Sequence, residues 1–200
     1  AMSPSFSNGD PRILVAGTNE DPLPRQYRDD TGRIEPLDLP LPTGALVRGF
    51  AFASDYATSG VVFVSALHVR PQLAGDFHWF EQVVYRCGPE RCTSVLDDAG
   101  ENAFALVTVG GPHPALYAWD EDSVHRADEH GSFVELGPPI RRSGELLEGL
   151  AAGTEGRLLA RTSSTTSTAS GLYVSDDHGT TWRSVPNPDG WWLDGVLVLP

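Results

Sequence analysis

The sequence predicts an all-β protein built from repeated antiparallel sheets. Its short apolar stretches alternate with a period of two, as in Leu172–Val174, where the outer two side chains face one side and Tyr173 faces the other. A polar turn with acidic residues and glycine recurs along the chain, as expected for repeated hairpins. No stretch keeps a helical period over a useful length, and Pro and Gly recur throughout, so we expect almost no helix.

The turn in residues 175–182, called the acidic turn below, carries the residue types of a tight hairpin. The Asp177 carboxylate can accept N–H groups within its own turn, and Gly179 can adopt a positive φ without a Cβ clash. Thr181 and Trp182 then restart a strand and supply a large ring that can cover the hairpin.

The pattern Ser-x-Asp-x-Gly-x-Thr-Trp, formed by Ser175, Asp177, Gly179, Thr181 and Trp182, resembles the Asp-box of bacterial neuraminidase repeats. The resemblance implies a β-propeller, a ring of four-stranded sheets called blades, in which this turn joins the third and fourth strands of a blade. Sortilin-type and photosystem-assembly propellers carry similar repeats. The resemblance also implies that the Asp-box residues tie down their own hairpin, so we expect their role to be structural.

Degenerate copies of the acidic turn occur at three other places. Residues 123–133 align without gaps on residues 171–181 and share an acidic pair, a His and a Gly. A further copy is residues 28–32. The fourth position falls on residues 85–93, where two cysteines stand in place of the acidic residues. We therefore expect a covalent link to do the work of the turn in that blade.

A second repeat has the same phase, because residues 54–65, a Ser-Asp-Tyr-Ala motif followed by an apolar strand, resemble residues 4–17. Together the repeats predict one domain of four blades, approximately residues 1–40 plus 191–200, 47–97, 103–137 and 147–186. The expected strands are 13–18, 25–29 and 33–39, then 47–53, 61–68, 79–87 and 92–96, then 104–109, 115–120, 124–127 and 132–136, then 147–153, 157–162, 172–175 and 181–185, with a leftover strand in 191–199.

The two ends of the chain suggest how the ring closes. The first blade lacks a first strand, whereas residues 191–199 provide a surplus first strand. If residues 196–199 fill the gap, the last strand closes a four-bladed propeller and hides two sheet edges. The alternative is a fragment of a larger propeller, or a half-ring completed by a second copy, because Asp-box rings resemble six- to eight-bladed ones.

Composition excludes several classes of partner. The 200 residues suffice for one domain with its own core. The net charge is −13 and all 14 basic residues are Arg, which argues against nucleic-acid binding and against docking on anionic membranes. No apolar run approaches the roughly 20 residues that span a bilayer. The N-terminal residues lack the pattern of an export signal, so we expect that any signal was removed or never existed.

Cys87 and Cys92 flank Gly-Pro-Glu-Arg, a spacing that suits a short hairpin closed at its base. A disulfide between them implies an oxidising compartment, so we expect a secreted, periplasmic or cell-surface protein. Free thiols in a cytosolic protein are the alternative, and a zinc pair is disfavoured because no second Cys or His pair has ligand spacing. His130 and His178 recur in register on separate blades, at a variable position of the repeat. We predict no metal and no other cofactor.

The longer loops of a propeller lie on the face opposite the Asp-box turns, where a rigid scaffold usually displays function. Arg and Trp on that face suit sugars or carboxylates, because guanidinium groups pair with acids and indole rings stack on apolar faces. The candidate ligand-binding residues are Arg70, His78, Trp79, Arg141, Arg142 and Trp191, with Trp192 beside the last. The alternative is that the Trp side chains lie partly in the core and the Arg side chains are solvated.

The sequence favours a non-enzymatic, exported recognition or scaffold domain that binds a protein or a glycan through the loop-rich face. It contains no nucleophile elbow, phosphate loop, dinucleotide fingerprint or zinc-protease motif. One alternative is a divergent sialidase-like glycoside hydrolase, which would need an arginine triad, a nucleophilic Tyr/Glu pair and an Asp that acts as the acid/base catalyst. Another is a structural module completed by self-association, so both a monomer and a homodimer remain open.

Overall fold

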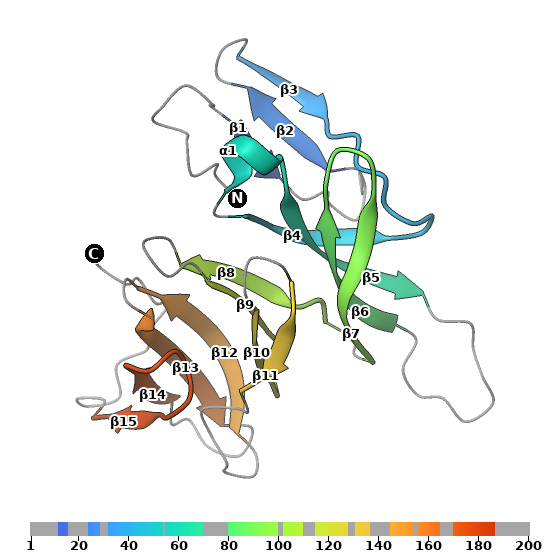
Figure 1. The fold of residues 1–200 in the computed structure, drawn as a ribbon. Coiled ribbons are helices and arrows are strands. Elements are labelled where there is room, and N and C mark those ends of the chain that lie inside the picture. The colour runs from blue at the N-terminus through green and yellow to red at the C-terminus, as the bar shows by residue number, and fades with distance from the viewer. Residues whose placement is uncertain are drawn as a thin grey trace, which may run out of the picture. The chain divides into compact units, whose positions relative to one another are not determined.

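Fifteen strands in the described part of the chain pair into four antiparallel sheets in this computed structural model (Figure 1). The chain divides into two compact units, Ala1–Leu106 and Val107–Pro200. The structure describes residues 12–15, 24–28, 32–53, 55–69, 80–99, 102–109, 115–127, 131–136, 145–153, 156–164 and 170–186.

The first unit contains a three-stranded sheet and a four-stranded sheet, and in both the strands are paired in chain order. The three-stranded sheet consists of β1 (Arg12–Val15), β2 (Arg25–Arg28) and β3 (Arg33–Pro36). The four-stranded sheet, called the clip sheet below, consists of β4 (Leu46–Phe52), β5 (Val62–Val69), β6 (Phe80–Cys87) and β7 (Cys92–Ala99). A one-turn helix, α1 (Tyr56–Ser59), lies between β4 and β5.

The other two sheets also have four strands each, paired in chain order. One consists of β8 (Ala105–Val109), β9 (Ala115–Trp119), β10 (Val124–Ala127) and β11 (Phe133–Glu135). The last, called the acidic-turn sheet below, consists of β12 (Glu145–Ala152), β13 (Leu158–Ser164), β14 (Ser170–Ser175) and β15 (Arg183–Val185).

The predicted all-β architecture is confirmed, and each described strand begins and ends within three residues of its predicted bounds. The three-stranded sheet is the one for which the sequence predicts a missing first strand. The leftover strand in 191–199 lies outside the described residues. Among the helices and strands of the described residues, α1 is the one that the sequence pattern misses, because a single turn is too short to show a period.

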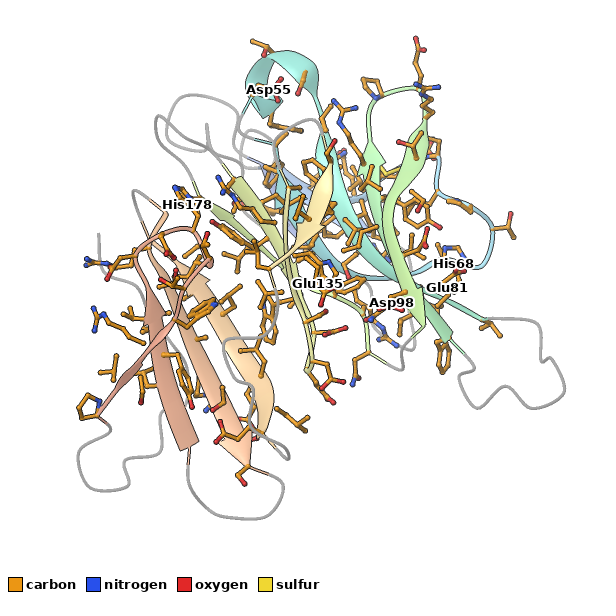
Figure 2. The ribbon with its side chains drawn as sticks, turned by 60° about the horizontal axis from the view of Figure 1, so that its bottom comes forward. Asp55, His68, Glu81, Asp98, Glu135 and His178 are labelled. Carbon is orange, nitrogen blue, oxygen red and sulfur yellow. A yellow bond between two sulfur atoms is a disulfide. The ribbon has the colours of Figure 1, made fainter. Side chains whose placement is uncertain are left out.

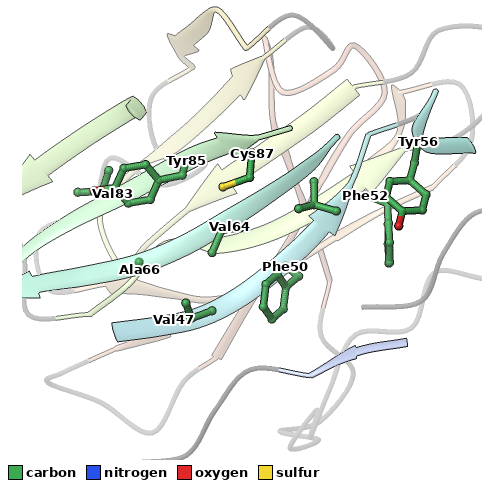
Figure 3. Packing of buried hydrophobic residues seen from close by; sticks show 10 residues of the cluster. Val47, Phe50, Phe52, Tyr56, Val64, Ala66, Val83, Tyr85 and Cys87 are labelled. Carbon is green, nitrogen blue, oxygen red and sulfur yellow. The ribbon is translucent and has the colours of Figure 1, made fainter. Parts of the chain in front are cut away.

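The clip sheet buries apolar side chains on both faces of β5, where Val62–Leu67 are each at most 5% exposed. Figure 3 shows the cluster on one face, in which alternate residues of β5 pack between β4 and β6. Its members are Val47, Phe50, Phe52, Tyr56, Val62, Val64, Ala66, Val83, Tyr85 and Cys87. A strand buried on both faces reads as a continuous apolar run. Only Ser65 breaks the run, and its hydroxyl donates a hydrogen bond to the carbonyl of Phe104.

In the second unit, the core lies between the two four-stranded sheets. Tyr117 and Val124 from one sheet pack in the same cluster as Leu147, Leu158 and Ala160 from the other. Burying a Leu or Val side chain stabilises the fold by about 1.5–3 kcal/mol, so this cluster holds the two sheets together. Trp182 and Tyr173 are half-buried at its border.

The clip sheet and the acidic-turn sheet share one strand register. Each has a single irregularity in its first strand, between Val47 and Gly49 in one and between Leu147 and Gly149 in the other. Three residues after that glycine, Phe52 pairs with Val62, and Ala152 pairs with Leu158. The two sheets are therefore structural repeats that can be aligned residue by residue.

In this alignment, the disulfide of the clip sheet takes the position that the acidic turn has in the acidic-turn sheet. Val62 pairs with Cys87, and its equivalent Leu158 pairs with Ser175. Across the hairpin Cys87 pairs with Cys92, and since Tyr173 pairs with Ser184, Ser175 faces Trp182. The cysteines thus occupy the positions of the first and last residues of the acidic turn.

Candidate functional site

Hydrogen bonds inside the acidic turn use both the Ser175 hydroxyl and the Asp177 carboxylate. Ser175 Oγ donates to Asp177 Oδ1 at 2.8 Å and accepts the N–H of Gly179 at 2.8 Å. The other end is held by Thr181, whose N–H and hydroxyl donate to the two Asp177 oxygens at 2.8 and 2.6 Å. Both polar side chains bind their own hairpin, and this leaves them little capacity for a ligand.

The charges at this turn follow from those bonds. Hydrogen bonds from Thr181 and Ser175 lower the pKa of Asp177 from 3.8 to about 2, because they favour the ionised carboxylate. A hydrogen bond from Arg157 at 2.7 Å, with a weaker one from Arg183, lowers the pKa of Asp176. The Asp176 pairs are exposed, so they contribute little to stability.

His178 anchors the acidic turn to the rest of its unit. It has a left-handed backbone, φ 61°, and its ring lies against Gly156, where any Cβ would overlap it. Its Nδ1 lies 3.3 Å from the hydroxyl of Tyr117 on β9, a fully buried phenol. Burial raises the pKa of Tyr117, so the phenol stays protonated and serves as a hydrogen-bonding group. The position that the sequence treats as variable has a packing role.

The Cys87–Cys92 disulfide is present, as predicted, with a Cα–Cα distance of 4.0 Å. The two residues face each other just outside a tight turn in which the Gly88 N–H donates to the Arg91 carbonyl at 2.9 Å. Facing residues that do not exchange backbone hydrogen bonds come closest in an antiparallel pair, which is where a cross-strand disulfide fits. We call residues 87–92 the clip hairpin.

A depression of about 310 Å³ lies beside the clip hairpin and is open to solvent. Its lining residues come from the hairpin, from the strand ends next to it and from the chain just after α1: Val61, Arg86, Gly88, Pro89, Glu90, Arg91 and Thr93. Arg86 pairs with Thr93 across β6 and β7, on the face opposite the disulfide. We call this feature the arginine depression. The sequence pattern gives Cys87 and Cys92 a structural role and does not predict this depression.

Among the residues that the structure describes, the guanidinium groups of the arginine depression form no ion pair. Among the described residues, no carboxylate lies within ion-pair distance of Arg86 or Arg91. The Arg86 Nε–H is shielded from solvent and has no hydrogen-bond acceptor among the described residues. A buried donor without an acceptor costs about 1–3 kcal/mol, so an oxygen ligand here would gain that energy back. The depression therefore offers hydrogen-bond donors that suit an anion.

Two further polar clusters lie on the third strands of the repeats. Tyr85 OH lies 2.6 Å from His68 Nε2, and Figure 2 shows His68 and Glu81 near each other, at the end of β5 and the start of β6. Burial, and then the charges of Glu81 and Asp97, raise the pKa of Tyr85, which keeps its phenol protonated. A protonated phenol can donate a hydrogen bond to a ring nitrogen that carries no proton.

The equivalent tyrosine of the acidic-turn sheet is Tyr173, which has a different partner. Its hydroxyl donates to Glu145 Oε2 at 3.2 Å, and Thr162 reaches the same oxygen at 3.5 Å. Gly171 lies beneath, where a Cβ would overlap both Thr162 and Tyr173. This Tyr–Glu pair links the first strand of the sheet to the third.

Asp120, Ser123 and His125 form a trio whose geometry differs from a catalytic triad. Ser123 Oγ donates to Asp120 Oδ1 at 2.8 Å and lies 3.0 Å from His125 Nε2. In a triad the carboxylate orients the imidazole and the imidazole activates the hydroxyl. Here Asp120 also accepts two backbone N–H groups of its own turn, so it shapes the β9–β10 connection.

The predicted ligand-binding residues lie outside the described part of the chain, so they remain predictions. They are Arg70, His78, Trp79, Arg141, Arg142, Trp191 and Trp192. His130 also lies outside it, together with residues 196–199. Over the residues that the structure describes, no group of three or more His, Cys, Asp or Glu could hold a metal ion. Within the same ranges, no helix has the length and apolar character needed to cross a bilayer.

Comparison with known proteins yields a similarity of fold. No family model matches the sequence, and no curated protein matches it. Among solved structures, the chain is similar to one from a study of two prolyl endopeptidases, with a TM-score of 0.51 and 15% sequence identity. The likeness covers 89% of this chain and 26% of that chain, so this chain spans about a quarter of the protein that it matches. At this identity the likeness shows the fold alone.

Proposed function

We propose that this chain is a non-enzymatic recognition module that binds the acidic group of a protein or glycan partner. The observation that carries the proposal is the arginine depression, where Arg86 and Arg91 lack acidic partners among the described residues although the chain has a net charge of −13. Guanidinium groups recognise carboxylates through paired N–H donors. An acidic surface around a local cationic site also favours a specific anion at that site over nonspecific binding.

The proposal includes membership in the Asp-box propellers. It is supported by the bonding of Ser175, Asp177 and Thr181 within one hairpin and by the register that the two four-stranded sheets share. In this proposal the sheets are blades, and residues 196–199 close a four-bladed ring. The Cys87–Cys92 disulfide supports an extracytoplasmic location, because such bonds persist in oxidising compartments. The loop-rich face with Arg70 and Trp191 would then offer a second binding surface.

The test is binding of the labelled chain to glycan arrays and to peptide arrays, each with acidic and neutral members. We expect binding to acidic members only, lost in the Arg86→Gln/Arg91→Gln double variant. Arg33→Gln is the matched control, since Arg33 is an exposed arginine on β3 of the same unit. Binding that survives in the double variant, or that ignores ligand charge, would contradict the proposal.

A glycoside hydrolase is the second candidate, and the Tyr173–Glu145 hydrogen bond is the observation that favours it. A tyrosine next to a carboxylate is the nucleophilic pair that the sialidase-like alternative needs. Release of product from chromogenic glycosides by the chain, lost in Glu145→Gln and Tyr173→Phe but kept in Arg86→Gln, would establish this candidate. The same result would overturn the non-enzymatic proposal.

A further inference from the structure

The arginine depression also contains an acidic residue, and this residue limits the kinds of ligand that fit the site. Glu90 lines it together with the two arginines, while Val61 and Pro89 supply apolar surface. A bare anion such as phosphate gains from the arginines but is repelled by Glu90. A ligand that carries both a carboxylate and hydroxyl donors suits all three charged groups, because hydroxyls donate hydrogen bonds to carboxylates.

The size and shape of the depression also suit a small ligand with several polar groups. A volume of about 310 Å³ lies at the small end of ligand sites, which suits one ring rather than an extended chain. Among the described lining residues, Val61 and Pro89 are the apolar ones, and they give a small apolar surface in a depression that is open to solvent. One apolar face of a pyranose ring can rest on such a surface, while its polar substituents reach the rim.

We propose that the arginine depression binds a sugar acid, a pyranose residue bearing a carboxylate, within a glycan. This inference rests on the proposed recognition function and names the ligand of the same site. Arg86 and Arg91 pair with the carboxylate, and Glu90 and the Thr93 hydroxyl bind ring hydroxyls. Binding turns the Arg86 guanidinium so that its Nε–H, shielded and without an acceptor in the described residues, meets a carboxylate oxygen.

The clip hairpin holds the site in shape. Among the described lining residues, Gly88–Arg91 lie between the two disulfide-bonded cysteines. On the opposite wall, the Gly60 backbone comes next to Pro89, so that a Cβ added to Gly60 would lie 3.7 Å from Pro89 Cγ. Gly60 ends α1 in a left-handed conformation, and the α1 turn is tied by a hydrogen bond from Ser59 to Asp55 at 2.9 Å. Both walls are thus fixed before the ligand arrives, which lowers the entropic cost of binding.

The experiment is an NMR titration of the ¹⁵N-labelled chain with glucuronate and galacturonate, each compared with its neutral hexose. For a ligand of this size we expect a dissociation constant on the order of 1 mM. Amide signals of Val61, Gly88 and Glu90–Thr93 should shift, and the Arg86 side-chain Nε–H signal should move as it gains an acceptor. Arg86→Gln should weaken binding at least tenfold, and Arg33→Gln should leave it unchanged.

The possible outcomes test the sugar-acid site separately from the proposed recognition function. Equal binding of uronate and neutral hexose, or shifts away from the clip hairpin, would overturn the sugar-acid site. Absence of uronate binding, while acidic peptides bind the array and lose binding in the double variant, would overturn the inference but keep the recognition function. Glu90→Gln distinguishes a sugar acid from a simple anion. It should weaken uronate binding but strengthen acetate binding.

Discussion

The clip sheet and the acidic-turn sheet close the same hairpin with different chemistry. One uses a disulfide between facing cysteines, and the other uses a network of hydrogen bonds around Asp177. The register shows that the two devices occupy equivalent positions, so the two repeats hold the same hairpin with different chemistry. The difference matters for function, because a hydrogen-bonded tie consumes polar side chains and a disulfide consumes none. Arg86 and Arg91 lie beside the clip and form no ion pair among the described residues.

The largest expected difference between the hairpins concerns their glycines. Gly179 has φ +87°, and a Cβ there would lie 2.7 Å from Leu136 Cδ1, whereas a Cβ at Gly88 would meet nothing within 4 Å. Gly179→Ala should therefore lower the free energy of unfolding by about 3 kcal/mol, through a strained backbone and overpacking. Gly88→Ala should cost no more than about 0.5 kcal/mol. Urea denaturation of both variants measures the contrast, and equal costs would contradict it.

The next effect should come from reducing the disulfide. Opening a loop this short should lower the free energy of unfolding by about 2 kcal/mol, because the unfolded chain regains conformational freedom. Urea midpoints with and without a dithiol reductant measure this loss. The Cys87→Ala/Cys92→Ala variant is the control, since it has no bond for the reductant to open. If that variant responds to the reductant as strongly, the effect does not arise from the clip.

The smallest effect should be a response to acid, confined to the acidic turn. The pKa of Asp177 in the folded chain, about 2, lies below its ordinary value of 3.8. A carboxyl whose pKa is lowered by folding contributes stability that is fully present when the pH is above its ordinary pKa. That stability is lost as the pH falls toward its pKa in the folded chain. Hydrogen exchange at Thr181 should therefore speed up relative to its intrinsic rate as the pH falls from about 5 to about 2.

The clip hairpin supplies the internal reference for that measurement. The Gly88 N–H donates to a backbone carbonyl, so its protection should not follow the same titration. Asp177→Asn should remove the pH dependence at Thr181 and leave exchange about tenfold faster at all pH values. A Thr181 amide that stays equally protected at about pH 2 and about pH 5 would mean that the carboxylate bonds do not hold the turn.

The sequence predicts the strands well because their signals are local. Period-2 alternation in β14, the continuous apolar run of β5 and the turn residues between strands all reflect burial and backbone preference within a few residues. The spacing of Cys87 and Cys92 is equally local, since a four-residue turn places facing residues close enough to bond. Each of these predictions depends on chain geometry that no distant contact has to supply.

The arginine depression and the His178 anchor could not be predicted in this way. The depression joins the chain after α1 to a hairpin more than 25 residues later, and nothing near Arg86 in the sequence marks Val61 as a neighbour. His178 meets Tyr117 from another sheet, 61 residues away. Both features depend on tertiary packing, and the periodicity of the sequence carries no information about tertiary contacts. The loop residues proposed for ligand binding, such as Arg70 and Arg141, belong to segments where neither period nor register is available as a guide.

The packing of His178 also determines how this part of the molecule opens. Its backbone N–H donates to the Gly156 carbonyl at 3.1 Å, its ring covers the same residue, and its Nδ1 reaches Tyr117. The β14–β15 hairpin therefore cannot separate without also releasing the β12–β13 turn and uncovering the phenol on β9. We expect the amides that these contacts hold to exchange together, as one cooperative unit, at pH values where the Asp177 carboxylate is ionised.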